Sequence, residues 1–145
     1  MKELPHSYSV TVTGESSTTN LVTSADNLPS IQVAPPSQFG GPGDQWSPEE
    51  LLIAAVANCF VLSFKAIAKA SKVEWQSISC ESEGTLAKVD RKILFTKVIT
   101  KAKLSIPSGQ SSVAAQRALK KAEETCFVTN SLTAEAELEY QIEEL

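Results

Sequence analysis

The sequence predicts an α+β fold over residues 1–145, a single domain in which a buried central helix and a second helix pack on an antiparallel sheet. Three observations favour this class. Residues 47–64 have the composition of a buried helix, residues 111–126 have the periodicity of an amphipathic helix, and stretches that alternate polar and apolar residues precede, separate and follow them. The predicted order is therefore strands, helix, strands, helix, strand. With 145 residues, 42% of them hydrophobic, the chain is long enough to bury a real core.

The N-terminal third is expected to form strands and a long loop. The expected strands are residues 8–13, 20–24 and 31–33. The following segment, residues 35–46, is rich in proline and glycine and can form neither a helix nor an inner strand. Phe39 and Trp46 are the side chains that this loop is predicted to bury. They could also line an apolar pocket for an acyl or aryl group.

The helix predicted at residues 47–64 is the element around which the rest is arranged. Ser47 is the expected N-cap, and Glu50 closes a capping box onto it. The run that follows contains Cys59 and has no polar stripe, which is typical of a helix buried on every side. Because the run is too short to span a bilayer and two lysines follow closely, we expect it in the protein interior, with the Cys59 thiol deep in a dry core.

The second half of the chain is expected to add a hairpin, a helix and a last strand. The predicted strands are residues 73–86, 93–106 and 134–143, with a turn at residues 89–92. The second helix, from about residue 111 to residue 126, has Cys126 on its apolar face. The glutamates of the last strand are expected to pair with the lysines of residues 93–106. Cys80 has an inward parity and is predicted to fill the core.

Composition and charge exclude several classes of function. A formal net charge of −4 disfavours nucleic acid and anionic membrane surfaces as partners. The N-terminus has no apolar leader, and three cysteines without one indicate the reducing cytoplasm, where thiols are free or catalytic. One histidine and no CxxC or HxxxH spacing argue against a zinc site, and we expect neither a metal nor a cofactor.

Two cysteines on buried helix faces are the candidate chemical site. Cys59 and Cys126 come within bridging reach if both helices bury those faces against each other or against the same sheet. Such a pair indicates peroxide reduction, in which one thiolate attacks the O–O bond to become a sulfenic acid and the other resolves it to a disulfide. The alternative is that both cysteines serve only as small hydrophobic residues in the core.

The segments around the two cysteines favour the first interpretation. PEELLIAAVANCF around Cys59 and AEETCFVTNSL around Cys126 resemble the signature segments PEELLxxAxxxCF and xxxCPVSxxL of the OsmC/Ohr family of thiol peroxidases. The resemblance implies an intertwined homodimer with two interface sites that reduces organic hydroperoxides and is itself reduced by a dithiol such as dihydrolipoamide. It also implies that Cys59 is peroxidatic, that Cys126 is resolving and that Glu49 is the active-site glutamate.

The chain departs from that family's pattern at one position. The family's arginine precedes the central helix, but this chain has no arginine or lysine between Lys2 and Lys65, and Gln38 stands before the aromatic residue. Another group must therefore lower the pKa of Cys59. Arg117 lies on the wrong helix face, and Arg91, at a turn, could reach the site only from a partner subunit. His6, near the N-terminus, is a third candidate and a weak one.

Glu49 lies ten residues before Cys59, about 15 Å along one helix, so it could serve the site only from the other subunit. An acid in a first helical turn is also favourable whatever its function, because it interacts with the helix dipole.

The missing arginine leaves a second function open. The alternative to an active peroxidase is a family member that has lost its peroxidase activity and binds an apolar small molecule at the dimer interface.

Overall fold

The structure is a computed structural model that describes residues 2–145. The chain divides into two compact units, Met1–Leu52 and Ile53–Leu145. Strands and helices occur in the predicted order, so the α+β class is confirmed. That residues 1–145 form one domain stays a prediction.

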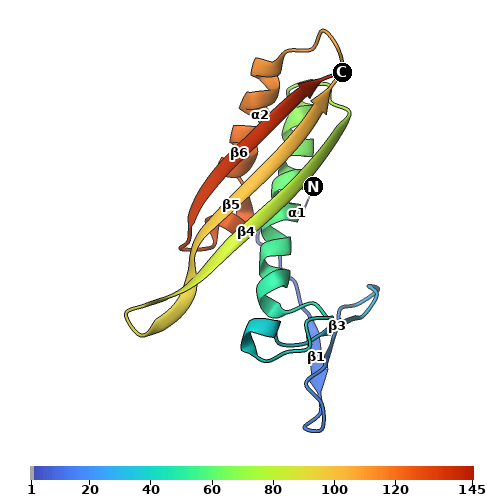
Figure 1. Ribbon diagram of the computed structural model, residues 1–145. Helices are drawn as coiled ribbons and strands as arrows, with labels where there is room; N and C mark the ends of the chain where they lie inside the picture. Colours follow the sequence, from blue (N-terminus) through green and yellow to red (C-terminus); the bar gives the residue numbers. More distant parts are fainter. Residues whose placement is uncertain (1) are drawn as a thin grey trace. The chain divides into compact units, whose positions relative to one another are not determined.

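The N-terminal unit contains a small antiparallel sheet in the order β1-β2-β3 (Figure 1). Its strands are β1 (Thr11–Gly14), β2 (Leu21–Ser24) and β3 (Ile31–Val33). The first strand begins three residues later than predicted, because Thr11 already pairs with Ser24, the last residue of β2. Residues 2–10 therefore have no partner strand within the described part of the chain, and Tyr8 is 87% exposed although its parity suits a strand.

The loop after β3 is held by backbone hydrogen bonds. The N–H of Ala34 donates to the carbonyl of Trp46 (2.9 Å), and a short 3-10 helix, η1 (Ser37–Phe39), is closed by the N–H of Phe39 on the carbonyl of Pro36 (2.9 Å). The prediction that Phe39 and Trp46 bury this loop is wrong for the single chain, since the two side chains are 58% and 51% exposed. Backbone hydrogen bonds can order such a loop without a buried aromatic group.

The central helix, α1 (Pro48–Ala70), begins where the sequence predicts. The hydroxyl of Ser47 accepts the N–H of Glu50 (3.1 Å) and donates to its carboxylate (2.8 Å), which is the expected capping box. The helix ends at Ala70, six residues beyond the predicted Phe64. It stops because Lys72 takes a left-handed conformation with φ of 57°, and the next N–H returns to the carbonyl of Ala68.

Only one stripe of α1 is buried, at residues Val56, Phe60, Phe64 and Ala68. The prediction that Cys59 lies deep in a dry core is therefore wrong for the single chain: Cys59 is half-buried, and Leu62 is 63% exposed. By length and composition alone α1 could cross a membrane, so the prediction that the run is too short was also wrong. One buried stripe is what a helix that packs one face on a protein core shows.

The C-terminal unit contains a second sheet, with the strand order β4-β5-β6 (Figure 1). Strands β4 (Ser77–Val89) and β5 (Lys92–Ile106) form a long antiparallel hairpin. The predicted turn is confirmed, with positive φ at both Asp90 and Arg91 (48° and 73°). The last strand, β6 (Glu135–Glu144), lies along the other side of β5.

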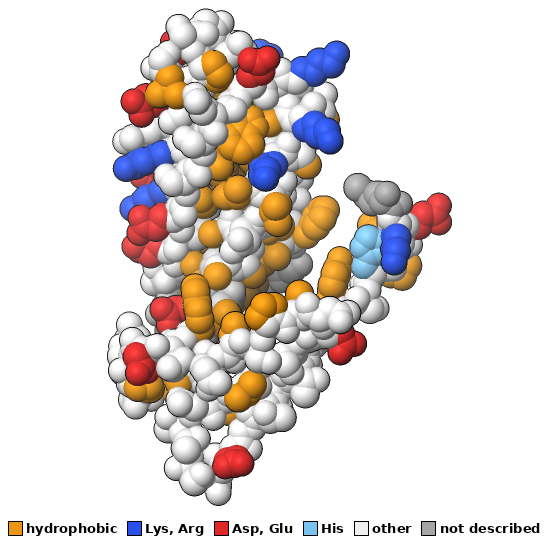
Figure 2. Space-filling model, turned by 90° about the vertical axis from the view of Figure 1, so that its right-hand side faces the viewer, with side chains coloured by type: hydrophobic (Ala, Val, Ile, Leu, Met, Phe, Trp, Pro, Cys, Tyr) orange, Lys and Arg blue, Asp and Glu red, His pale blue; other side chains and the backbone are white. Residues whose placement is uncertain are grey.

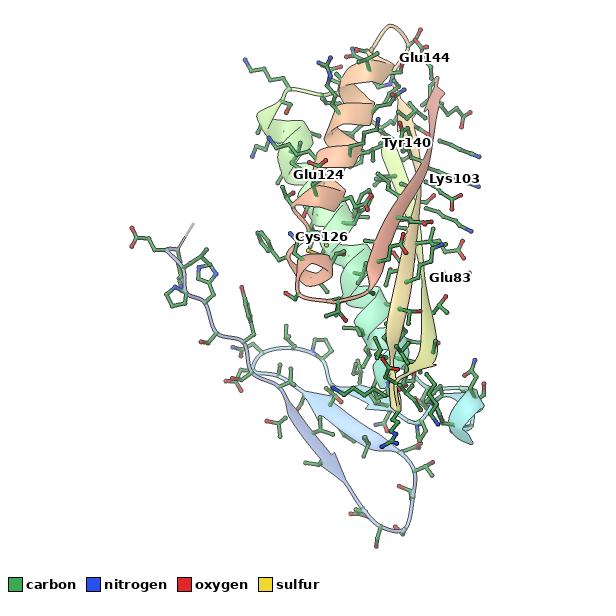
Figure 3. The ribbon with its side chains drawn as sticks, turned by 90° about the vertical axis from the view of Figure 1, so that its left-hand side faces the viewer. Glu83, Lys103, Glu124, Cys126, Tyr140 and Glu144 are labelled. Atoms are coloured by element: carbon green, nitrogen blue, oxygen red, sulfur yellow. The ribbon has the colours of Figure 1, made fainter. Side chains whose placement is uncertain are left out.

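The second helix, α2 (Ser112–Glu124), packs with α1 on one face of this sheet (Figure 3). Ser111 caps it by accepting the N–H of Ala114 (3.2 Å). The buried core shared by α1, β5 and α2 consists of Phe60, Phe64, Ala68, Ala102, Leu104, Ile106, Ala115, Ala118, Leu119 and Ala122. Each predicted inward face therefore contributes to one core.

The pairing of β5 with β6 is parallel, which corrects the prediction of a purely antiparallel sheet. The chain leaves the end of β5, crosses over through α2 and returns to start β6 at the same end as β5, as strand–helix–strand connections do. The predicted match of charges is confirmed. Lys97 lies opposite Glu135 and Lys101 opposite Glu139, and the Lys97 ammonium lies 3.1 Å from the Glu137 carboxylate.

Candidate functional site

Cys126 lies in a break between two helices (Figure 3). Helix α2 ends at Glu124, where the hydroxyl of Thr125 donates to the carbonyl of Lys121 (2.8 Å). Cys126 is then extended and serves as the N-cap residue of a one-turn helix, α3 (Phe127–Asn130). The prediction that Cys126 lies on the face of the second helix is therefore wrong, although the side chain is buried as expected, with 1% exposed.

The structure brings the two predicted thiols together. The thiol of Cys126 donates a hydrogen bond to the sulfur of Cys59, which stands half-buried on α1. Both cysteines are free thiols. The pKa of each thiol responds to the other, so the two sulfur atoms are neighbours, brought together by the turn between α2 and α3 instead of by two packed helix faces. That they come within reach of a disulfide bridge stays a prediction.

Backbone amides at the start of α3 lower the pKa of Cys59, in a chain that has no arginine before the central helix. Burial raises the pKa of Cys59, but the N–H of Val128, the thiol of Cys126 and the N–H of Phe127 lower it, and so does the hydroxyl of Ser63 one turn along α1. The net pKa lies below the ordinary value for cysteine. These N–H groups belong to the first turn of a helix and have no partner within it, so they are available to a thiolate.

The pKa of Cys126 is displaced in the other direction. Burial raises it most; the hydroxyl and N–H of Thr129 lower it, and the neighbouring Cys59 raises it again. Because the net pKa of Cys126 lies above the ordinary value and that of Cys59 lies below, Cys59 is the first of the two to ionise. An ionised thiol beside a protonated one is the arrangement of a nucleophile with a waiting partner.

The other predicted residues lie outside this contact. Glu49 is in the first turn of α1, and its buried Oε1 has no hydrogen-bond partner among residues 2–145. Its assignment to the active site stays a prediction. Cys80 packs against the core as predicted, and burial raises the pKa of its thiol, so this cysteine is a poor nucleophile.

The sequence pattern does not by itself predict the donors to the sulfur atoms. Ser63 stands four residues after Cys59, a spacing that places the two on one helix face and could have indicated the contact. Thr129, three residues after Cys126, has the spacing of a residue that returns to an N-cap. The amides of Phe127 and Val128 have no signal in the side-chain pattern.

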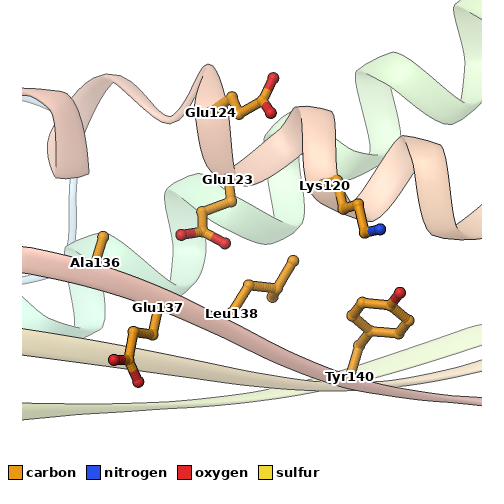
Figure 4. Close-up of a pocket in the computed structure, with 7 residues that line it drawn as sticks. All are labelled: Lys120, Glu123, Glu124, Ala136, Glu137, Leu138 and Tyr140. Atoms are coloured by element: carbon orange, nitrogen blue, oxygen red, sulfur yellow. The ribbon is translucent and has the colours of Figure 1, made fainter.

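A separate pocket of about 450 Å³ lies between α2 and β6 (Figure 4). Its lining residues are Lys120, Glu123, Glu124, Ala136, Glu137, Leu138 and Tyr140. Burial, and then the neighbouring carboxylates of Glu124 and Glu137, raise the pKa of Glu123. None of the lining residues is a cysteine, so the pocket offers no thiol to a peroxide.

Comparisons with known proteins cover the part of the chain that contains the two thiols. The sequence model described as OsmC-like protein matches residues 41–141, a range that includes both Cys59 and Cys126. The uncharacterized protein YmaD of Bacillus subtilis is 27% identical over 123 residues, which are 83% of this chain and 81% of that protein. Peroxiredoxin OsmC of Escherichia coli is 31% identical over 96 residues, which are 66% of each chain.

Among solved structures, an OsmC-like protein of unknown function from Vibrio cholerae superimposes with a TM-score of 0.86 at 22% identity. The superposition covers 94% of this chain and 100% of that one, and it establishes a common fold. Because the family model matches more than half of the chain, the chain belongs to the OsmC/Ohr family of OsmC-like proteins, which is linked to peroxide-related redox chemistry.

Proposed function

We propose that this protein reduces organic hydroperoxides, with Cys59 as the peroxidatic and Cys126 as the resolving cysteine. The observation that carries the proposal is the placement of the buried Cys126 thiol and the first amides of α3 beside the half-buried Cys59, which lowers the pKa of Cys59 while that of Cys126 is raised and makes Cys59 the first of the two to ionise. A thiolate, not a thiol, attacks a peroxide. No arginine is required, because the amides of α3 and the neighbouring thiol stabilise the charge.

The reaction proceeds in three balanced steps. The Cys59 thiolate attacks one peroxide oxygen, the O–O bond breaks, Cys59 becomes a sulfenic acid and the alkoxide takes up a proton to leave as an alcohol. The Cys126 sulfur then attacks the Cys59 sulfur, the S–S bond forms and the hydroxyl group leaves as water. A dithiol finally exchanges with this disulfide, which regenerates both thiols and oxidises the dithiol to its own disulfide.

The surroundings of the thiols favour an alkyl or aryl hydroperoxide over hydrogen peroxide. Phe127, directly after Cys126, is 79% exposed, and Leu62, three residues after Cys59, is 63% exposed. Figure 2 shows further hydrophobic side chains gathered on a face of the C-terminal unit. Apolar side chains of this kind bind the organic part of a substrate. They contribute no binding free energy toward hydrogen peroxide, which has no organic part. The name of the E. coli relative, a peroxiredoxin, supports the peroxide part of the proposal.

The proposal includes a homodimer in the cytoplasm. A single chain leaves much of α1 accessible, with Leu62 63% exposed, and leaves a buried carboxylate oxygen of Glu49 without a hydrogen-bond partner among residues 2–145. A second copy of the chain would cover the exposed part of α1 and provide a hydrogen-bond donor for the Glu49 oxygen. We assign Glu49 on these grounds to a site completed by the partner subunit. The cytoplasm supplies the reduced dithiol that the cycle consumes.

The test is turnover of an alkyl hydroperoxide, such as tert-butyl hydroperoxide, with dihydrolipoamide as the dithiol. The wild-type protein is expected to consume peroxide and dithiol in equal amounts, and C59S is expected to abolish consumption. C80S is the matched control, because Cys80 is a half-buried thiol away from the contact, and it is expected to retain the wild-type rate.

Two results would decide against the proposal. Oxidation of Cys59 no faster than that of free cysteine would favour the rival, in which the same apolar surroundings bind a small molecule without chemistry. Equal turnover by wild type and the double variant C59A/C126A would leave both cysteines as core residues only.

A further inference from the structure

Thr129 makes a contact that the cycle above leaves unexplained. Its hydroxyl lies 3.2 Å from the Cys126 sulfur and donates a hydrogen bond to it. A threonine hydroxyl inside a helix normally donates to a backbone carbonyl three or four residues earlier. Thr125 does this, on the carbonyl of Lys121 (2.8 Å), whereas Thr129 donates to a thiol instead.

The surroundings of Cys126 make this hydroxyl the main source of polar stabilisation for its sulfur. The side chain is 1% exposed, so bulk water does not solvate it. A charge that forms on a buried atom must be stabilised by protein donors. The hydroxyl and the N–H of Thr129 are the groups that lower the pKa of Cys126, against burial and the neighbouring Cys59.

We propose that Thr129 is a positioning residue for the resolving step: its hydroxyl holds the Cys126 sulfur toward Cys59 and stabilises the negative charge that the sulfur acquires as it attacks. The inference rests on the proposed peroxidase function and assigns one further residue to it. In the resting state the donors form a chain, from the Thr129 hydroxyl to the Cys126 thiol and from that thiol to the Cys59 sulfur. Each donor in such a chain polarises the next.

The chain acts after Cys59 has been oxidised. The Cys126 thiol loses its proton and attacks the sulfenic acid of Cys59; the S–S bond forms as the S–O bond breaks, and the leaving hydroxide takes up the proton and becomes water. The Thr129 hydroxyl keeps donating to the Cys126 sulfur until the bond is made. Since Thr129 donates to Cys126 and reaches Cys59 only through it, while amides of α3 and Ser63 also donate to Cys59, loss of this hydroxyl should slow resolution more than the first oxidation.

The experiment compares T129V, T129S and T125V with the wild type in single-turnover oxidation by tert-butyl hydroperoxide. Cys59 sulfenic acid is trapped with dimedone, and the disulfide is followed by mass spectrometry. Because one hydrogen bond is lost and the more basic thiolate is a better nucleophile, T129V is expected to form the disulfide about twofold more slowly at pH 7, with a rate-against-pH profile displaced upward. T129S restores the hydroxyl and the rate, and T125V, which removes only a bond to backbone, behaves as wild type.

A slow second step exposes the sulfenic acid to further peroxide, so T129V should also accumulate sulfinic acid on Cys59. Disulfide formation in T129V at the wild-type rate and with the wild-type pH profile would overturn the inference. So would a failure of T129S to restore the rate, since packing alone would then explain the variant.

Oxidation by diamide separates this inference from the proposed function, because diamide forms the same disulfide through attack of Cys126 on a Cys59 adduct without a peroxide. Slower closure in T129V than in T129S under diamide supports the role of Thr129 even in a protein that proves inert to hydroperoxides. Equal closure under diamide overturns it, whatever the peroxidase result.

Discussion

The substitution F127P tests whether backbone amides activate Cys59. Phe127 is the first residue of α3, a position that proline favours, and the preceding Cys126 is already extended (φ −67°, ψ 112°), as a residue before proline must be. The signature segment that the chain resembles has proline here. The substitution therefore removes one N–H donor from the Cys59 sulfur and leaves the backbone conformation unchanged. Loss of the ring should cost little stability, because Phe127 is 79% exposed.

The expected magnitude follows from one hydrogen bond to a charged sulfur. Such a bond contributes about 1.5 kcal/mol when shielded from water, and we take about 1 kcal/mol for a half-exposed thiolate. The thiolate population below the titration midpoint should fall about fivefold. A more basic thiolate is also a better nucleophile, with a Brønsted slope of about 0.4–0.5, so the rate should fall only about twofold. Above the midpoint the variant should react about twofold faster than wild type.

The assay is alkylation of Cys59 by iodoacetamide between pH 5 and 10, read by peptide mass spectrometry. F127A is the matched control, because it removes the same ring and keeps the N–H. F127P is expected to shift the midpoint upward and to cross the wild-type curve, and F127A to follow wild type. Identical profiles for F127P and F127A would refute the assignment of this amide to the thiolate.

Two further predictions concern stability. A side chain at Gly84 would meet Ile53 of α1 and Phe95 of β5, so G84A is expected to lower the free energy of unfolding by about 1–3 kcal/mol in urea denaturation; an unchanged midpoint would mean that α1 and β4 have room to spare. The pKa of Glu123 is raised in the folded protein, so its protonated form stabilises the fold at low pH, and this contribution is lost as pH rises through the raised pKa. E123Q should therefore raise the free energy of unfolding at pH 8 relative to wild type by roughly 0.5 kcal/mol at most and leave it unchanged at pH 4, as measured by thermal denaturation. A variant less stable than wild type at pH 8 would contradict the sign.

Local signals predicted the elements that carry their own boundary residues. The capping box at Ser47, the hairpin turn at Asp90 and the alternating faces of β5 and β6 were all predicted from neighbours in sequence. Helix ends that have no glycine or proline were not predicted from neighbouring residues. The end of α1 relies on Lys72 in a left-handed conformation, and α2 ends before Thr125, whose backbone (φ −104°, ψ 7°) is not helical. Neither residue type marks a helix end by itself.

Features that depend on connections or on backbone groups were harder to predict. Alternating charges are compatible with either strand direction, and only the crossover through α2 makes β5 and β6 parallel. The exposure of Phe39 and Trp46 depends on what covers the loop, which hydrophobicity alone does not reveal. The thiol pair could be predicted from two cysteines, but the amides that lower the pKa of Cys59 belong to every residue and acquire a role only through the fold.

The most direct measurement of the central claim is the state of the cysteines after one equivalent of an alkyl hydroperoxide. Peptide mass spectrometry under non-reducing conditions should find a disulfide between Cys59 and Cys126 and a free thiol at Cys80. A Cys59 that remains a thiol, or that bonds to Cys80 instead, would contradict the account of two cooperating sulfur atoms.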